Sequence, residues 1–317
     1  MLLSDIYKLK RAQWNAAVEE MKRLEEENNR IFIDAYGLQD ELTPDVPLKE
    51  ITLTCNPVYR YGEGDEADLE QRLLADTIKE LLSYAVGCAM GRYSLDEPGL
   101  IYAHAGNVGF DKNRYKTFPA DDDGIIPLME RDWFPDDMTR RFEEFLTASF
   151  GKENLAVNLK FVEDSLGKEI RDHYAKDFFA DHLKRYKKRP IYWLFSSGKL
   201  KAFQCIVYLH RYNAGTLSRM RTEYLVSLQA KINARLDRIP GERNAAGSTA
   251  AKKQLDKEAD TLKNQAEELR VYDEKLRHYA DMKIELDLDD GVKVNYGKFG
   301  DLLANVKDIA GKRSDEE

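Results

Sequence analysis

Residues 187–212 read KKRPIYWLFSSGKLKAFQCIVYLHRY. Two runs rich in aromatic and branched residues, 191–196 and 202–210, are separated by the polar, glycine-containing segment 197–201. This order predicts a β-hairpin. Pro190 lies directly before the first run and predicts the end of a preceding helix, because proline disfavours helical backbone in the residue before it. We therefore expect the hairpin to follow a helix directly.

The segment around this hairpin differs in charge from the rest of the chain. Residues 180–222 contain ten lysines and arginines against one acid, Asp181, whereas the whole chain has a net charge of −8. A cationic segment on an acidic protein is typical of a surface that binds a polyanion, and nucleic acid is the first partner to consider. The cations predicted to bind DNA are Lys184, Arg185, Lys187, Lys188, Arg189, Lys199, Lys201, Arg211, Arg219 and Arg221.

Aromatic residues alternate with these cations along the sequence, and two interpretations stay open for them. In the first, some aromatic rings or arginine side chains contact bases while the other cations bind phosphates. In the second, the aromatic residues form the core of the hairpin and the cations a solvated rim. Alternation along the strands leaves at most half of the aromatic residues free for a ligand. These residues are Tyr186, Tyr192, Trp193, Phe195, Phe203, Tyr208 and Tyr212.

Helical periodicity is present on both sides of the hairpin. A long first helix is expected to end near Gly37, and the chain from 240 to 250 is expected to be a loop between two antiparallel helices. A short strand is expected at 291–294. The fold class predicted is α+β, mainly α, with a β-hairpin and an antiparallel helical hairpin. The other helices are expected at 68–90, 136–149, 216–238 and 252–280.

The helix expected at 252–280 carries a leucine at every seventh position, namely Leu255, Leu262, Leu269 and Leu276. A heptad of this kind is compatible with an intermolecular coiled coil. Only one row of the heptad is rich in leucine, however, and Asp273 interrupts the neighbouring row. The spacing therefore favours packing within the chain, against the helix expected at 216–238.

Composition limits the class of protein. The chain has 317 residues, 43% hydrophobic and 33% charged, which is typical of a soluble, helix-rich globular protein. Three widely spaced cysteines indicate free thiols in the cytoplasm, and no apolar run is long enough to span a membrane. We expect three parts: a long connecting helix at 1–42, a helical domain with a loop-rich insertion at 43–189, and the two hairpins with a tail at 190–317.

Motifs for catalysis or metal binding are weak. Asn56-Pro57-Val58-Tyr59 differs by one residue from Asn-Pro-Pro-Tyr, in which an amide and an aromatic ring hold a flipped adenine. No glycine-rich cofactor turn precedes it, so the favoured interpretation is a turn after a strand at 51–54. The histidines and cysteines do not have the spacing of a metal site. We therefore predict no catalytic residues and no metal ligands in this chain.

Several strings resemble the carboxyl-terminal region of the PglX family, the adenine-specific DNA methyltransferases of the BREX phage-defence system. The similarity extends in order over nearly all of the chain. The strings are EENN (26–29), YGL (36–38), NPVYRYG (56–62), GCAMGRYSLD (87–96), KKRPIYWLFSS (187–197), VYLHRY (207–212) and DGVKVNY (290–296).

The resemblance has consequences for fold and activity. Larger members of the family carry a methyltransferase core with a glycine-rich cofactor turn and a true Asn-Pro-Pro-Tyr motif, and they use S-adenosylmethionine. Neither motif is present here, so the resemblance implies a chain with no complete methyltransferase Rossmann core, no cofactor of its own and no activity alone. It is either a fragment or a separately encoded module.

Two functions follow from these observations. The first is a module that holds double-stranded DNA for a BREX-type methyltransferase, with the cations on backbone phosphates. The second is a scaffold that docks to the methyltransferase core or to other BREX or restriction-modification proteins through its helices. A freestanding enzyme is the third and least favoured alternative. The partners expected are therefore DNA and BREX proteins, and no membrane.

Overall fold

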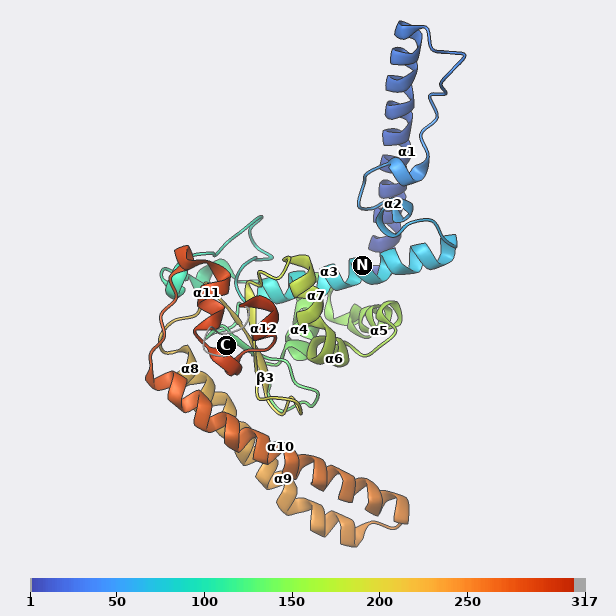
Figure 1. Ribbon diagram of the computed structural model, residues 1–317. Coiled ribbons are helices and arrows are strands. Elements are labelled where there is room, and N and C mark those ends of the chain that lie inside the picture. Colours follow the sequence, from blue (N-terminus) through green and yellow to red (C-terminus); the bar gives the residue numbers. More distant parts are fainter. Residues whose placement is uncertain (1, 311–317) are drawn as a thin grey trace. The chain divides into compact units, whose positions relative to one another are not determined.

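The computed structural model describes residues 2–310 and consists of two compact units (Figure 1). Unit 1 contains residues 2–82 and 146–168, and unit 2 contains residues 83–145 and 169–310. The three-part division expected from the sequence stays a prediction. No helix within residues 2–310 has the length and apolar character needed to cross a bilayer.

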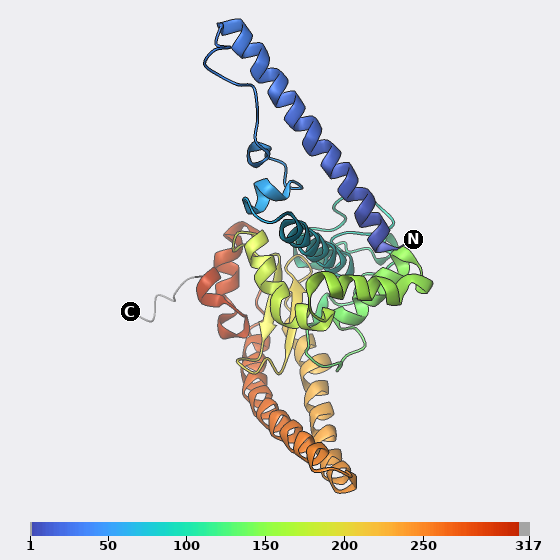
Figure 2. The ribbon, with the colours of Figure 1, turned by 90° about the vertical axis from the view of Figure 1, so that its right-hand side faces the viewer.

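Unit 1 is helical, and its longest element is α1 (Figure 2). The helix was predicted to end near Gly37, and this is confirmed: Gly37 has a φ of 66°, and its backbone N–H donates to the carbonyl of Asp34 at 3.2 Å. Glycine adopts this left-handed conformation without the steric cost of a Cβ. The elements are α1 (Leu3–Tyr36), η1 (Leu48–Glu50), α2 (Pro57–Tyr61), α3 (Glu66–Ala89), whose last residues belong to unit 2, η4 (Lys152–Asn154) and α5 (Leu155–Leu166).

Asn56 organises the chain before α2. Its side-chain amide donates to the carbonyls of Leu48 and Ile51 at 2.7 and 3.0 Å, and its Oδ1 accepts from the N–H of Val58 at 3.1 Å. The side chain is therefore a helix cap and is only 2% exposed. The strand expected at 51–54 is wrong, because these bonds hold the segment in an irregular turn.

Unit 2 is built around a three-stranded antiparallel sheet in the order β1-β3-β2. The predicted hairpin is confirmed as β2 and β3, with Tyr192 opposite Tyr208. The sequence analysis missed β1, which has only three residues and pairs with β3. The elements before the helical hairpin are η2 (Ala105–Asn107), η3 (Lys112–Arg114), β1 (Ile125–Pro127), α4 (Met138–Phe150), which continues into unit 1, α6 (Ile170–Asp172), η5 (His173–Asp177), α7 (Phe178–Arg185), β2 (Tyr192–Ser196) and β3 (Gln204–Tyr208).

Both faces of this sheet are covered. On one face Trp193 packs against Tyr296 and Phe299, with ring centroids 5.3 and 5.6 Å apart. On the other face Tyr192 packs against His182 of α7, with centroids 4.9 Å apart. The aromatic residues of β2 and β3 are at most 2% exposed, so none of them is free to stack on a base. These residues therefore form core, as in the second of the two interpretations, because helices cover the second face of the sheet as well.

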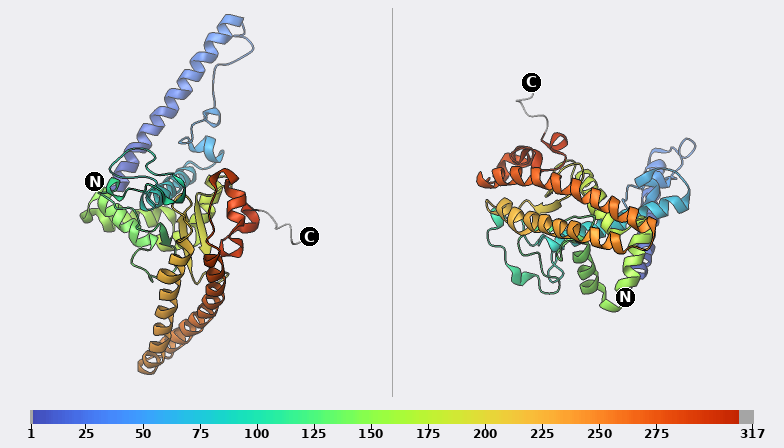
Figure 3. Two further views of the ribbon diagram at one scale, coloured as in Figure 1. Left: turned by 90° about the vertical axis from the view of Figure 1, so that its left-hand side faces the viewer. Right: turned by 90° about the horizontal axis from the view of Figure 1, so that it is seen from below.

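The predicted helical hairpin is confirmed, with two long helical stretches side by side (Figures 1 and 3). Leu262, Leu269 and Leu276 are fully buried within the unit, as intramolecular packing requires. The loop expected from residue 240 is shorter, because the helix continues through Pro240. The elements are α8 (Thr216–Arg219), η6 (Met220–Leu225), α9 (Val226–Ala245) and α10 (Thr249–Asp281).

Packing and ion pairing explain why α9 continues past its proline. Pro240 has no N–H and therefore removes one helical hydrogen bond. The residue before it, Ile239, is only 3% exposed. In the last turn, Arg243 pairs with Asp256 of α10 at 2.6 Å. These contacts offset the loss of the bond.

The strand expected at 291–294 is wrong, because the chain forms a helix there. The side-chain amide of Asn295 donates to the carbonyls of Asp287 and Gly291, which stabilises a helical turn. This turn buries Tyr296 against Trp193 of β2. The last elements are η7 (Leu288–Asp290), α11 (Gly291–Gly297), η8 (Gly300–Leu302) and α12 (Val306–Ile309).

Candidate nucleic-acid interface

Five of the predicted DNA-binding cations lie together where α7 leads into β2. We call Lys184, Arg185, Lys187, Lys188 and Arg189 the cationic turn. All five side chains are exposed, and none of them forms an ion pair within residues 2–310. Elsewhere in unit 2 exposed arginines such as Arg140 and Arg270 face carboxylates. The cationic turn therefore presents positive charge that the described part of the chain does not neutralise.

The backbone of the cationic turn is tightly constrained. Lys187 and Lys188 have φ values of 50° and 61°, in the left-handed region that lysine rarely adopts. The N–H of Lys188 donates to the carbonyl of Leu183 at 2.8 Å, which closes the end of α7. Two consecutive residues in this region cost roughly 1 kcal/mol or more each. The surrounding packing must therefore hold the turn in place.

His182 provides that packing beneath the turn. Its Nε2 accepts from the backbone N–H groups of Ile191 and Tyr192 at 3.1 and 3.2 Å, and its ring lies 4.5 Å from that of Tyr186. Burial lowers the pKa of His182 to about 3, and the charges of Arg185 and Arg92 contribute. A neutral ring is required for Nε2 to accept hydrogen bonds. His182 thus fixes the start of β2 to the end of α7.

Lys199 and Lys201 belong to the loop at the opposite end of β2. Glu268 of α10 holds this loop: its carboxylate accepts from the Ser197 hydroxyl at 2.6 Å and from the N–H of Ala202 at 3.1 Å. A strand of five residues is about 16 Å long. The two lysines are therefore separated from the cationic turn by the length of β2, and the predicted track along the basic segment is divided.

Arg211 is buried, with 1% of its surface exposed. Its Nη1 and Nη2 donate to the carbonyls of Asp121 and Asp122 at 2.7 and 3.0 Å, and its guanidinium lies 3.9 Å from the ring centroid of Phe110. These contacts make Arg211 a structural residue that holds the loop before β1. The predicted phosphate contact of Arg211 would compete with these bonds to the carbonyls of Asp121 and Asp122.

Arg219 and Arg221 have acidic neighbours. Arg221 makes two hydrogen bonds to the carboxylate of Asp273 in α10, at 2.7 and 3.1 Å. Arg219 lies 3.5 Å from Glu223 on the same helical face. Both charges are therefore offset within the chain, and neither residue is brought next to the cationic turn by any contact of the described residues.

The structure also brings Arg92 close to the cationic turn, and the sequence analysis did not single it out. Arg92 follows the end of α3, and its charge acts on His182 together with that of Arg185. About ninety residues separate Arg92 from Arg185 in the chain. Arg92 lies in the string GCAMGRYSLD (87–96), which carried the family resemblance but did not indicate a cation near the cationic turn.

Three aspartates of unit 2 form a partly buried acidic cluster. The hydroxyl of Tyr224 contacts Asp123 and Asp136 at 3.2 and 2.9 Å. Burial, together with the nearby charge of Asp121, raises the pKa of Asp123 to about 7. Within residues 2–310, no three His, Cys, Asp or Glu side chains come together as a metal site. The raised pKa of Asp123 therefore makes the stability of the fold depend on pH.

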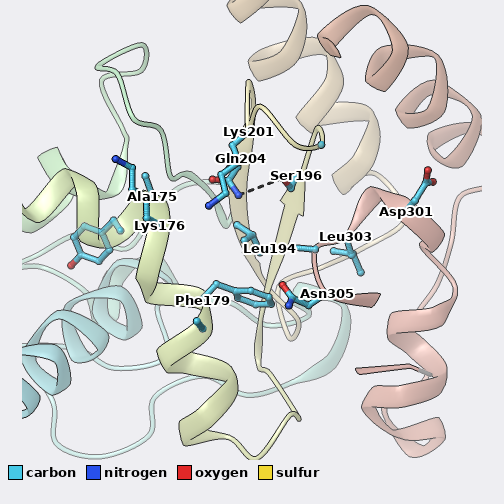
Figure 4. Close-up of a pocket in the computed structure, with 14 residues that line it drawn as sticks. Ala175, Lys176, Phe179, Leu194, Ser196, Lys201, Gln204, Asp301, Leu303 and Asn305 are labelled. Atoms are coloured by element: carbon cyan, nitrogen blue, oxygen red, sulfur yellow. Dashed lines mark hydrogen bonds between the residues drawn. The ribbon is translucent and has the colours of Figure 1, made fainter. Parts of the chain in front are cut away.

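A pocket of about 310 Å³ lies between η5, the start of α7 and the sheet (Figure 4). Gln204 and Ser196 form part of its wall, with the Gln204 amide 3.4 Å from the Ser196 hydroxyl. Phe179 and Leu194 supply an apolar side, and Lys201 lies at the loop. Lys176 and Asp301 also line the pocket.

These observations define the class of protein. It is mainly helical, with one antiparallel sheet and a cationic turn whose charge is not neutralised within residues 2–310. No protein-family model matches the chain. Comparison with curated proteins confirms the resemblance predicted from the sequence: the chain is similar to part of two adenine-specific methyltransferases.

The first is the adenine-specific methyltransferase BrxX of Escherichia coli O9:H4 (strain HS), which is 51% identical over 311 residues, covering 92% of this chain and 26% of the relative. The second is the adenine-specific methyltransferase PglX of Lacticaseibacillus casei (strain Zhang), which is 42% identical over 300 residues, covering 90% of this chain and 23% of the relative. The chain thus spans about a quarter of the length of these curated relatives.

Proposed function

We propose that this chain is the DNA-binding carboxyl-terminal module of a BREX-type, PglX-like adenine-specific DNA methyltransferase that serves phage defence. The observation that carries the proposal is the cationic turn, with five exposed and unpaired cations on a chain of net charge −8. Lysine and arginine bind backbone phosphates through charge and hydrogen bonding, without reading the sequence. The module would therefore hold DNA rather than select its target.

Methyl transfer, in this proposal, takes place in a part of the methyltransferase that this chain does not contain. S-adenosylmethionine would bind that part, and the catalytic core and other BREX proteins would be the protein partners. The similarity to a quarter of each relative supports this division. Because the DNA of a bacterial cell lies in the cytoplasm, the proposal places the chain there as well.

The experiment is a fluorescence-anisotropy titration of the purified chain with duplex DNA at several salt concentrations. We expect log affinity to fall with log salt concentration, with a slope of about −0.9 for each phosphate that is neutralised. Replacing Lys187, Lys188 and Arg189 together by glutamate should weaken binding by about a hundredfold or more at low salt, since it removes attraction and adds repulsion.

A matched control changes the same net charge elsewhere. Lys252, Lys253 and Lys257 of α10 also form no ion pair within residues 2–310. Replacing these three by glutamate should leave most of the affinity. Equal losses in the two triple variants would show that only net charge matters, and a flat salt response of the unaltered chain would refute the phosphate contacts.

A second candidate function, a protein-interaction scaffold, is favoured by the far end of α1. Ile31, Phe32 and Tyr36 are 60%, 54% and 73% exposed, and Leu42 just after the helix is 53% exposed. Exposed apolar side chains grouped in this way are typical of a protein contact. Replacing Phe32 and Tyr36 by serine should leave DNA binding intact but release a protein partner under this alternative.

A further inference from the structure

Arg92 is a half-buried arginine, and no carboxylate among the described residues pairs with it. Its Nε donates to the hydroxyl of Tyr93 at 3.2 Å and its Nη1 to the hydroxyl of Tyr208 at 2.9 Å, while Nη2 makes no hydrogen bond to any described residue. Other partly buried arginines of the chain face acids: Arg11 pairs with Glu70 and Arg171 with Asp137. A guanidinium away from bulk water normally needs such an anion.

Two histidines sense the charge of Arg92 and stay neutral. Burial is the main cause that lowers the pKa of His182, and the charges of Arg185 and Arg92 lower it further. Burial is also the main cause that lowers the pKa of His210, and Arg92 and His104 lower it further. The ring of His210 lies 5.0 Å from that of Tyr208, to which Arg92 donates. No acid contributes to either of these shifts.

The backbone fixes Arg92 in this position. Gly91 has a φ of 75°, and the N–H of Arg92 donates to the carbonyl of Gly87 at 2.8 Å. A Cβ at Gly87 would lie 2.5 Å from the ring of Tyr93, so only glycine allows this ring to pack there. The guanidinium is thereby positioned before any ligand arrives.

We propose that Arg92 binds one phosphate group, and that this phosphate belongs to the backbone of the nucleic acid held by the cationic turn. Nη2 of Arg92 keeps N–H groups that can donate to phosphate oxygens, and these bonds are strong because both partners are charged. A phosphate supplies the anion that the region lacks. This inference rests on the proposed DNA-binding function and adds a residue outside the basic segment to it.

The test compares Arg92→Gln and Arg92→Lys in the full chain by anisotropy with duplex DNA across salt concentrations. Arg92→Gln should reduce the salt slope by about 0.9 and weaken binding about tenfold near 0.1 M salt. Arg92→Lys keeps the charge but loses the guanidinium, so its slope should stay and its affinity fall several-fold. Arg72→Gln is the control, because Arg72 also lacks an ion pair and lies 4.4 Å from the Tyr61 ring in unit 1.

The outcomes separate this inference from the proposed function. If the unaltered chain binds DNA and Arg92→Gln lowers only its melting temperature, with affinity and slope unchanged, Arg92 is a structural residue and the inference is wrong. If Arg92→Gln does not fold, the DNA affinity of Arg92→Lys is the test. A several-fold loss supports the inference, and an unchanged affinity overturns it. If the unaltered chain does not bind DNA, the proposed function fails, and titration with inorganic phosphate, followed by NMR at the arginine Nε–H, becomes the test. A saturable shift lost in Arg92→Lys would then support a free-phosphate site, and no shift would overturn it.

Discussion

The cationic turn and the arginines that follow β3 come from one basic segment. The charges of the turn stay exposed, whereas those of the arginines are bound by other groups of the chain. The five cations of the turn are exposed, and none of them forms an ion pair with another residue of the 2–310 range. Arg211 is buried on the carbonyls of Asp121 and Asp122, and Arg221 is paired with Asp273. The partners of the second group come from distant parts of the chain. A cation is therefore available to a ligand only where the fold brings no acid or carbonyl to it.

Arg211→Met should have the largest effect and tests the buried side of this comparison. The substitution keeps much of the side-chain length but removes the donors that satisfy two buried carbonyls. We expect the free energy of unfolding to fall by about 3 kcal/mol, measured by urea denaturation. DNA affinity per folded molecule should not change. A stable variant with weakened binding would instead show that Arg211 contacts DNA.

Asp123→Asn should have the next largest effect, because Asp123 belongs to the acidic cluster near Arg211. Its pKa is raised to about 7 by burial and by Asp121, whereas an unfolded aspartate titrates near 4. Stability from this group is therefore complete below about pH 4 and is lost as the pH rises through about 7. Asparagine does not ionise and keeps the Oδ1 acceptor for the Ile125 N–H.

We expect Asp123→Asn to be more stable than the unaltered chain at pH 8 by on the order of 1 kcal/mol, and this advantage to vanish near pH 4. Melting temperatures measured from pH 4 to 8 provide the comparison. Asp136 also has a raised pKa because of burial, so part of the pH dependence should remain in the variant. Parallel curves for the two proteins would contradict the assignment to Asp123.

A pair of alanine substitutions compares a free with a paired cation directly. Lys187→Ala should weaken DNA binding by roughly threefold to tenfold and reduce the salt slope by about 0.9, with little change in stability. Arg221→Ala should leave binding unchanged and lower the free energy of unfolding by at most about 1 kcal/mol, because its ion pair is partly exposed. A loss of stability in Lys187→Ala together with a loss of DNA binding in Arg221→Ala would contradict this assignment of the free and the paired cation.

Lys188→Gly should have the smallest effect and separates strain from charge. Glycine adopts the φ of 61° without steric cost, so the folded turn should gain about 0.5 to 1 kcal/mol, partly offset by the greater entropy of the unfolded chain. DNA affinity should still fall, because one cation is lost. Thermal unfolding and anisotropy on the same preparation would show whether stability and binding move in opposite directions.

Local signals in the sequence were sufficient for most of the regular structure. The hairpin was predicted from two apolar runs around Gly198, the end of α1 from Gly37, and the helical hairpin from the leucine row of α10. These signals work because periodicity and turn residues act within a few positions of the chain. β1 was missed, since three residues carry too little pattern, and α11 was mistaken for a strand.

The sequence by itself determined the fold class, the basic segment and the resemblance to the adenine-specific methyltransferases. Only the tertiary structure decided which cations stay free, that both faces of the sheet are buried, and that Arg92 lies near Arg185. The physical reason is that burial and ion pairing depend on contacts between residues far apart in the chain. Net charge along a segment is a local quantity, whereas the charge that a ligand meets depends on every group packed beside it.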